Sequence, residues 1–491
     1  MKTTTPQRHL FRPARWGLPA KAIASLGQRL SAFWERFRPC FRTRTRDTSE
    51  NAYTYLRGQL TMQDDRNFAN MDRRLNGGDG QQLQEFMSNS PWSAQAVFGQ
   101  IQADITGRRS LHSGGVLILD ESADEKAGWY SAGAGRQYNG RLGKVDVCQV
   151  STCLCYAHPA TGTATLVDGE LFFPEVWFSP EYAELREQVG VPPARQFATK
   201  PQLGLQMIGR VQAHRLPFDL VACDDLYGRN QTFREALEKG GIHYAAEVPA
   251  DTVVYLKRPP VKRYRKPGRA GRAAGRGQAV VAEPAWQVRQ VAARPQTRWR
   301  RQQVRHSERG VLEADFAVQR LWTLTEKHRV RAEWLVIRRD LEGKLTFVLL
   351  TAEPGVSAGE LIQRSCQRQF IERTFQEAKS ELGWDDFRAR KYLAWEHELA
   401  LTAAALWFVA EVKLDWRESY PRDPELARQL QVEVLPALST ANVRELLRAV
   451  LPLPELSPEQ ARKLVVTHLV NRARSTSSRL KKQRNQEESF P

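Results

Sequence analysis

The feature that most constrains the fold is a series of short apolar runs, beginning near Gly114, that alternate with helical segments. Short apolar runs bounded by turn-prone or polar residues predict strands. The five predicted strands are Val116–Leu119, Val145–Tyr156, Thr163–Phe173, Asp219–Cys223 and His243–Val248. The first and the fourth are predicted to be buried, and they end at Asp120 and Asp224 respectively.

The order of strands and helices indicates the fold class. Helices are predicted near 181–188, 203–214 and 232–239, and a long helix over Ala358–Leu382 ends at Gly383. Three strands, a helix, a strand, a helix, a strand and, after an interruption, a final helix is the element order of a ribonuclease-H-like fold. We therefore expect an α/β chain with a mixed five-stranded sheet and helices on both faces. In that arrangement the first and fourth strands place Asp120 and Asp224 side by side, and the final helix brings a third acid to them.

A basic region interrupts this pattern. Lys257–Arg276 contains nine basic residues and no acid, a composition that cannot bury a core. A hairpin is then predicted from Trp334–Arg338 and Leu345–Thr351. The predicted division is a basic, disordered arm at 1–49, a helical DNA-binding domain at 50–108, the first part of the catalytic core at 109–250, a basic β-rich insertion at 251–345, the second part of the core at 346–410, and a helical C-terminal region with a basic tail at 411–491. Two alternatives stay open: an arm that orders on DNA, and a plain helical cap at 50–108.

Charge and composition indicate the partner and the compartment. The 73 Lys and Arg residues exceed the 55 acids by 18, which favours a polyanionic partner such as nucleic acid. No apolar run reaches the roughly 18 residues that a membrane span requires. The six cysteines lack zinc-ligand spacing and are expected to be reduced thiols of a cytoplasmic protein. We expect no membrane contact and no small-molecule cofactor.

The predicted final helix carries the third acid between two cations. Glu372 follows Arg368 by four residues and precedes Lys379 by seven, so a regular helix projects all three side chains from one face. Phosphoryl transfer by two metals needs carboxylates that hold two divalent cations about 4 Å apart. The sequence thus predicts Asp120, Asp224 and Glu372 as ligands of two Mg²⁺ or Mn²⁺ ions. The alternatives are an aspartate that caps a turn and a surface helix with ion pairs, and neither explains all three acids together.

Five blocks carry a resemblance to a known family. They are Leu119–Ser122, Gly135–Gln149, Cys223–Gly228, the Arg368–Glu372–Lys379 set, and Glu381–Arg390 followed by Trp395 and His397. In this order they resemble bacterial insertion-sequence transposases with an Asp–Asp–Glu triad, in the subgroup with a Tyr-x2-Arg-x3-Glu-x6-Lys signature. The resemblance spans about residues 110–410, and Ser365 stands where that signature has tyrosine.

The resemblance implies a DNA transposase that cleaves a strand at the element's end to release a 3′-hydroxyl and then joins that end to target DNA. It implies that the insertion contacts terminal inverted repeats and that a homodimer holds two ends. Residues expected to contact DNA are Arg136, Lys144, Lys262, Arg263, Arg265, Lys266, Arg388 and Arg390. Trp286, Trp299 and Trp322 are expected in a hairpin core, with stacking on an extruded base as the alternative.

Two other functions stay open at this stage. One is a domesticated or decayed transposase that only binds DNA, which the intact acids argue against and Ser365 leaves open. The other is a different ribonuclease-H-like nuclease, such as a junction resolvase, which the large basic insertion disfavours.

Overall fold

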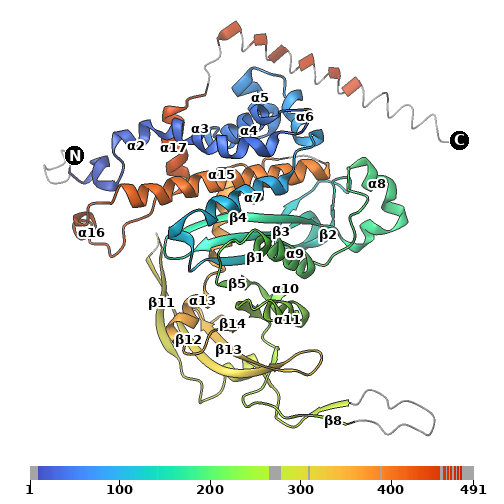
Figure 1. The fold of residues 1–491 in the computed structure, drawn as a ribbon, viewed down its shortest axis with the longest axis vertical. Coiled ribbons are helices and arrows are strands. Elements are labelled where there is room, and N and C mark those ends of the chain that lie inside the picture. Colours follow the sequence, from blue (N-terminus) through green and yellow to red (C-terminus); the bar gives the residue numbers. More distant parts are fainter. Residues whose placement is uncertain are drawn as a thin grey trace.

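The computed structural model describes residues 9–140, 142–264, 278–307, 310–387 and 390–453, together with scattered residues between 457 and 481. A ten-stranded mixed sheet runs through the molecule in the order β11-β12-β13-β14-β6-β5-β1-β3-β2, with β4 paired to β3 (Figure 1). Its strands are β1 Val116–Glu125, β2 Gly135–Asn139, β3 Lys144–His158, β4 Thr163–Phe172, β5 Leu220–Cys223, β6 Tyr244–Val248, β11 Arg300–Ser307, β12 Gly310–Leu324, β13 Val330–Arg339 and β14 Leu345–Leu350.

Five of these strands form the predicted ribonuclease-H-like sheet. In the order β4-β3-β1-β5-β6, β1 is antiparallel to β3 and parallel to β5, and β5 is parallel to β6. The expectation that the first strand ends at Asp120 is wrong, because β1 continues to Glu125. Its parallel pairing with β5 stops at Leu119, whereas its antiparallel pairing with β3 goes on from Asp120 opposite Cys153 to Glu125 opposite Cys148.

The insertion extends this sheet. β14 pairs antiparallel with β6, and β13, β12 and β11 follow by successive antiparallel pairing, which confirms the predicted hairpin of β13 and β14. Two small ribbons join β7 (Val253–Val254) to β10 (Trp286–Gln287) and β8 (Val261–Tyr264) to β9 (Gln278–Val281). A separate small core beneath them includes Val254, Val291, Leu321 and Leu335. The insertion therefore has its own small hydrophobic core, although its strands continue the sheet of the catalytic core.

Helices cover the sheet and build the N-terminal and C-terminal parts. They are α2 Ala20–Ala24, α3 Leu26–Phe37, α4 Ser49–Thr61, α5 Phe68–Asn76, α6 Gln81–Asn89, α7 Ala94–Thr106, α8 Ala183–Gln188, α9 Lys200–Ala213, α10 Asp225–Gly228, α11 Gln231–Lys239, α12 Val288–Ala292, α13 Ala358–Ser365, α14 Gln369–Gln376, α15 Tyr392–Ser419, α16 Glu425–Gln429 and α17 Thr440–Val450. The short helices expected between residues 50 and 108 are thus present. A DNA-binding role for them, and the functional division of the chain, stay predictions.

The N-terminal segment differs from the disordered arm expected at 1–49. Residues 20–37 form α2 and α3, and Phe33, Phe37 and Phe41 are fully buried. Phe33 packs edge to face against Phe408 of α15 at a centroid distance of 5.2 Å. The basic residues alone suggested disorder, but the aromatic residues between them bury enough apolar surface to order the segment.

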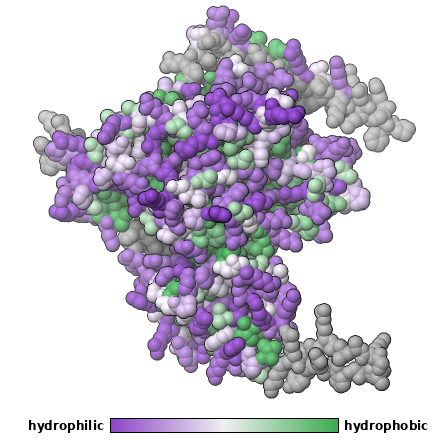
Figure 2. Space-filling model, viewed as in Figure 1, coloured by the Kyte–Doolittle hydropathy of each residue, from purple (hydrophilic) through white to green (hydrophobic). Residues whose placement is uncertain are grey.

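Helix α15 lies between the sheet and the N-terminal helices (Figure 1). It packs on β4 and on α4, α6 and α7, and its apolar stretch Leu399–Val412 is buried on every side. A helix that is apolar all round belongs in a protein core or a membrane. Among the described residues, no helix is long and apolar enough to span a bilayer. The face of the molecule in Figure 2 is mainly hydrophilic, with apolar residues in scattered patches.

The single long helix predicted over 358–382 is divided. α13 ends at Ser365, α14 begins at Gln369, and a π-helical turn, Glu377–Glu381, follows it. α13 packs on β6, β12, β13 and β14, whereas α14 packs on β1, β3 and β4. The break lets the two halves follow different parts of a twisted sheet, and it leaves Arg368 at the junction between them.

Candidate active site

Three acids stand in one row across neighbouring parallel strands. Leu119 of β1 is in register with Cys223 of β5, and Cys223 is in register with Ala246 of β6. The next residues of the three segments are Asp120, Asp224 and Glu247. Residues at the same level of parallel strands point to the same face, so the sheet itself gathers these carboxylates.

The turn after β5 fixes Asp224. Its Oδ1 accepts hydrogen bonds from the backbone N–H groups of Leu226 at 3.0 Å and Tyr227 at 3.4 Å, and it caps α10. α10 then passes directly over β6 at Gly228, where a Cβ atom would lie 1.8 Å from the Glu247 carbonyl oxygen. Only glycine permits this approach, which explains the Tyr-Gly pair of the predicted block.

Glu121 reaches the same place from the other face of β1. Ligand oxygens of Asp120, Glu121 and Asp224 all lie within 4.8 Å of one another. The Lys200 ammonium of α9 is 3.8 Å from Glu121, and the buried Oε1 of Glu121 accepts no hydrogen bond. The rule that adjacent strand residues face opposite ways holds for the backbone, but the longer glutamate side chain brings its carboxylate to the same edge.

Arg368 connects this row to Glu372. Its Nε lies 3.2 Å from Asp120 Oδ2, its Nη1 lies 2.8 Å from Glu247 Oε2, and its Nη2 lies 3.1 Å from Glu372 Oε1. The Glu372 side chain is 60% exposed and lies outside the close group of Asp120, Glu121 and Asp224. The structure thus brings the three predicted acids to one site, with the third attached through an arginine.

Lys379 also points at the site. Its Nζ donates to the carbonyl of Ala123 on β1 at 3.4 Å and lies 5.6 Å from the centre of the Trp384 ring. Arg368 and Lys379 therefore both reach β1 and lie on either side of Glu372 along the chain. Ser365, at the signature tyrosine position, donates its hydroxyl to the carbonyl of Ile362 at 2.7 Å and ends α13.

The electrostatics of the site follow from burial. The pKa of Asp120 is raised to about 7, mainly by burial, with Arg368 lowering it and the charges of Asp224 and Glu121 adding to the rise. Burial likewise raises the pKa of Glu121, Asp224 and Glu247. Desolvated carboxylates that crowd together are a high-energy arrangement without further cations. Their oxygens suit Mg²⁺ or Mn²⁺.

The sequence analysis missed Glu247. The strand around it was predicted, and within Tyr-Ala-Ala-Glu-Val it is the one charged residue. An acid in an otherwise buried strand needs a counter-ion, and that signal could have marked it. Its partner, Arg368, is 121 residues away and was not recognisable from the sequence.

The predicted DNA-contact residues are spread over the surface. Arg136 on β2, Lys144 on β3 and Arg390 are exposed, and Lys144 pairs with Asp146 at 3.0 Å. Lys262 and Arg263 belong to β8, whereas Arg265, Lys266 and Arg388 lie outside the described residues. No contact between these side chains and the acidic row is among the described interactions, and their DNA contacts stay predictions.

The insertion tryptophans have packing roles. Trp286 and Trp299 are partly buried against the small core of the insertion, as expected. The Arg339 guanidinium lies 4.2 Å from the Trp299 ring centre, a cation–π distance.

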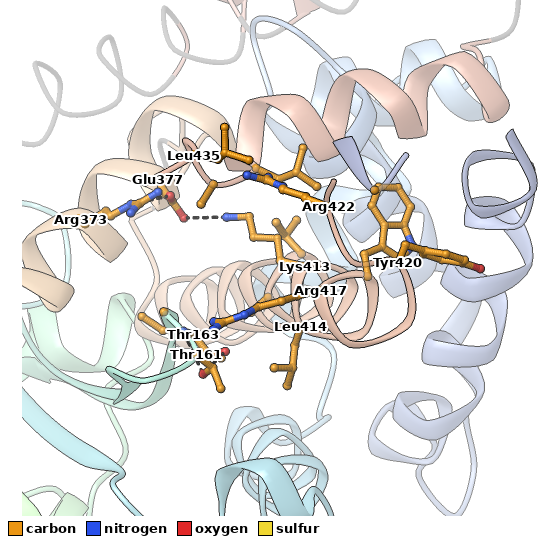
Figure 3. Close-up of a pocket in the computed structure, with 18 of the residues that line it drawn as sticks. Thr161, Thr163, Arg373, Glu377, Lys413, Leu414, Arg417, Tyr420, Arg422 and Leu435 are labelled. Carbon is orange, nitrogen blue, oxygen red and sulfur yellow. Dashed lines mark hydrogen bonds and ion pairs between the residues drawn. The ribbon is translucent and has the colours of Figure 1, made fainter. Parts of the chain in front are cut away.

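A cavity of about 590 Å³ lies elsewhere, beside the outer face of α14 (Figure 3). Arg373 and Glu377 line it from the α14 segment and Lys413 and Arg417 from α15, with Glu377 and Lys413 paired at 3.8 Å. None of Asp120, Asp224 and Glu372 lines this cavity. The candidate site therefore lies at the carboxyl ends of the central strands β5 and β6, beside Asp120 of β1, and not in this cavity.

Comparison with known proteins assigns the family. Residues 36–311 match the family described as DDE superfamily endonuclease, which is more than half of the chain. The chain belongs to this family and is an enzyme of the class that acts on DNA with divalent metal ions. The match includes β1 and β5 with Asp120 and Asp224 and stops before Glu372.

A curated relative is more specific. The probable transposase for insertion sequence element IS701 of Microchaete diplosiphon is 24% identical over 336 residues, which are 65% of this chain and 71% of the relative. The recognition of an insertion-sequence enzyme with an Asp–Asp–Glu site is thereby confirmed. The subgroup with the Tyr-x2-Arg-x3-Glu-x6-Lys signature stays a prediction.

Proposed function

We propose that the chain is the transposase of an insertion sequence, with Asp120, Asp224 and Glu372 as its metal-binding acids. The observation that carries the proposal is the row of acids across β1, β5 and β6, joined to Glu372 through Arg368. Two divalent cations, when bound by these carboxylates, would activate the attacking oxygen and stabilise the leaving oxygen. Mg²⁺ and Mn²⁺ fit the all-oxygen donor set.

The chain's own residues would orient the DNA. Arg368 and Lys379 present cations on either side of Glu372, where they can bind phosphate oxygens next to the scissile bond. Cleavage by water at the element's end leaves a 3′-hydroxyl, and that hydroxyl attacks a phosphodiester of target DNA and displaces its 3′ oxygen. Both are direct displacements at phosphorus and need no covalent enzyme intermediate.

The basic insertion and a second copy of the chain would hold the ends. We place the terminal inverted repeats along cations of the insertion and of β2 and β3, including Lys262 and Arg263 of β8 and the exposed Arg136 and Lys144. Contacts to phosphate fix the register of a protein on a duplex. Two ends must be joined to one target, so we expect a homodimer on DNA, which light scattering with end DNA would detect.

The test is cleavage of labelled DNA that carries the terminal inverted repeats, in Mg²⁺, by the wild type and by Asp120→Ala, Asp224→Ala and Glu372→Ala. We expect each substitution to abolish cleavage and to leave binding of end DNA intact. Asp225→Asn is the matched control, because Asp225 lies beside Asp224 in the chain but pairs with Arg229 at the surface. Cleavage unaffected by all three substitutions would refute the triad.

The second candidate function is a decayed transposase that only binds DNA, favoured by Ser365 at the signature tyrosine position. Binding of end DNA by the wild type without cleavage, in Mg²⁺ or Mn²⁺, would establish it.

A further inference from the structure

The Arg368 guanidinium is shared by three carboxylates that have different roles in the proposed reaction. Two of its partners, Asp120 and Glu372, are proposed metal ligands, at 3.2 Å and 3.1 Å. The third, Glu247, has the shortest contact, at 2.8 Å, and is not in the close group of potential ligands. A metal cation that binds Asp120 and Glu372 therefore deprives Arg368 of two of its three counter-ions.

We propose that Glu247 is a positioning residue. It keeps Arg368 in the site when Asp120 and Glu372 coordinate metal ions. The inference rests on the proposed function and extends it. In the structure the Arg368 guanidinium pairs with all three acids. On metal binding it moves off Asp120 and Glu372, remains paired with Glu247, and presents its freed N–H groups to a phosphate of the DNA.

Glu247 is held more firmly than the arginine it pairs with. It lies on a central strand, in register with Val348 of β14 and next to β5. Its backbone is further enclosed by α10 at Gly228. Arg368, by contrast, stands at the break between α13 and α14, where no sheet pairing holds its backbone. A fixed acid and a movable arginine suit a contact that persists while the arginine changes its other partners.

The charges around Glu247 leave one competing explanation. Arg338 and Asp224 are the other charged groups that act on Glu247 from the neighbouring elements. Glu247 could therefore act through Arg368, as proposed, or directly, as a further negative charge or ligand for the metal. The two explanations differ in whether the effect of Glu247 requires Arg368.

A double-mutant cycle on Mn²⁺ affinity separates them. The full chain, free of DNA, is titrated with Mn²⁺ and free metal is measured by electron paramagnetic resonance, for wild type, Glu247→Gln, Arg368→Gln and the double variant. We expect Glu247→Gln to weaken binding about tenfold, as is typical for groups that support metal ligands, because Arg368 then stays on Asp120 and Glu372. We expect Arg368→Gln to tighten binding, since it removes the competitor, and the double variant to match Arg368→Gln.

Each other outcome overturns the proposal. An equal loss from Glu247→Gln in the Arg368→Gln background would make Glu247 a ligand or a simple charge, and an equal loss from Asp225→Asn would make it a simple charge. Weaker binding by Arg368→Gln alone would exclude competition, and this test stands even if Glu247→Gln does not fold. Failure of the proposed function is distinguishable, because Asp120→Asn with Asp224→Asn would then leave Mn²⁺ binding unchanged.

Discussion

Two arginine–carboxylate clusters lie on the same sheet, and they differ in the ratio of hydrogen-bond donors to acids. In the closed cluster, Arg234 of α11 pairs with Glu333 of β13 at 2.9 Å, and both side chains are almost fully buried. The two oxygens of Glu333 also accept hydrogen bonds from the hydroxyls of Tyr244 and Thr323. One acid there has donors at both of its oxygens.

The open cluster has too few cations for its acids. Arg368 serves Asp120, Glu247 and Glu372 together, and its side chain remains 26% exposed. The comparison distinguishes the closed cluster, whose ion pair supports the fold, from the open cluster, whose acids are proposed to bind metal. A buried pair resists the loss of either member, whereas crowded carboxylates gain stability from any cation that joins them.

The largest difference between the clusters is expected when Asp224 of the open cluster and Glu333 of the closed cluster are each replaced by alanine. Asp224→Ala should lower DNA cleavage by about a thousandfold or more, because a metal ligand contributes several kcal/mol to the transition state. Its free energy of unfolding without metal should stay close to that of wild type, because the removal of one of several repelling charges offsets the loss of the α10 cap, which costs about 0.5–2 kcal/mol. Cleavage rates and urea unfolding measure the two effects. A large loss of stability would place Asp224 with the structural acids.

In the closed cluster the effect should be on stability. Glu333→Ala leaves Arg234 buried without its counter-ion, which should cost about 3–5 kcal/mol of unfolding free energy. Urea denaturation in the absence of metal is the measurement, and Asp225→Asn, at an exposed pair, is the control with no measurable loss. Unchanged stability of the Glu333 variant would remove the distinction between the clusters.

The open cluster should also give the stability of the protein a pH dependence. The pKa of Asp120 is about 7 in the folded chain against an ordinary value of 3.8, so below pH 3.8 the carboxyl is neutral in both states. As the pH rises toward 7, the unfolded chain ionises first and the folded chain loses stability relative to it. Metal-free wild type should therefore lose on the order of 2–4 kcal/mol between about pH 4 and 7 relative to Asp120→Asn. If the unfolding free energies of the two proteins changed equally with pH, this expectation would be contradicted.

Added metal should reverse part of that loss. Mn²⁺ at a hundred times its dissociation constant should raise the unfolding free energy by about 2.7 kcal/mol, through binding to the folded state alone. Asp120→Asn combined with Asp224→Asn should remove this gain, whereas Glu333→Gln, if it folds, should keep it. Thermal unfolding with Mn²⁺ and with a chelator measures both.

Much of the fold was predictable because its strands are buried. The apolar runs of β1, β3, β4, β5 and β6 are continuous enough to identify each strand and its order. β2, β11 and β12 were not predicted, since polar and basic residues interrupt their apolar patterns. These segments become strands through hydrogen bonding to neighbouring strands. The ordered N-terminal helices were missed because charge was given more weight than the aromatic residues between the charges.

The sequence by itself identified the candidate acids of the site: two aspartates that come directly after buried apolar runs, and a glutamate spaced between Arg368 and Lys379. The family match then covers both aspartates. Those signals are local, because strand burial and helical spacing act over a few residues. Only the tertiary structure decided that Glu247 joins the row, that Glu121 reaches it from the opposite face, and that Arg368 links Glu372 to Asp120. These contacts depend on the register of parallel strands and on a helix break, which bring together residues that lie more than a hundred positions apart.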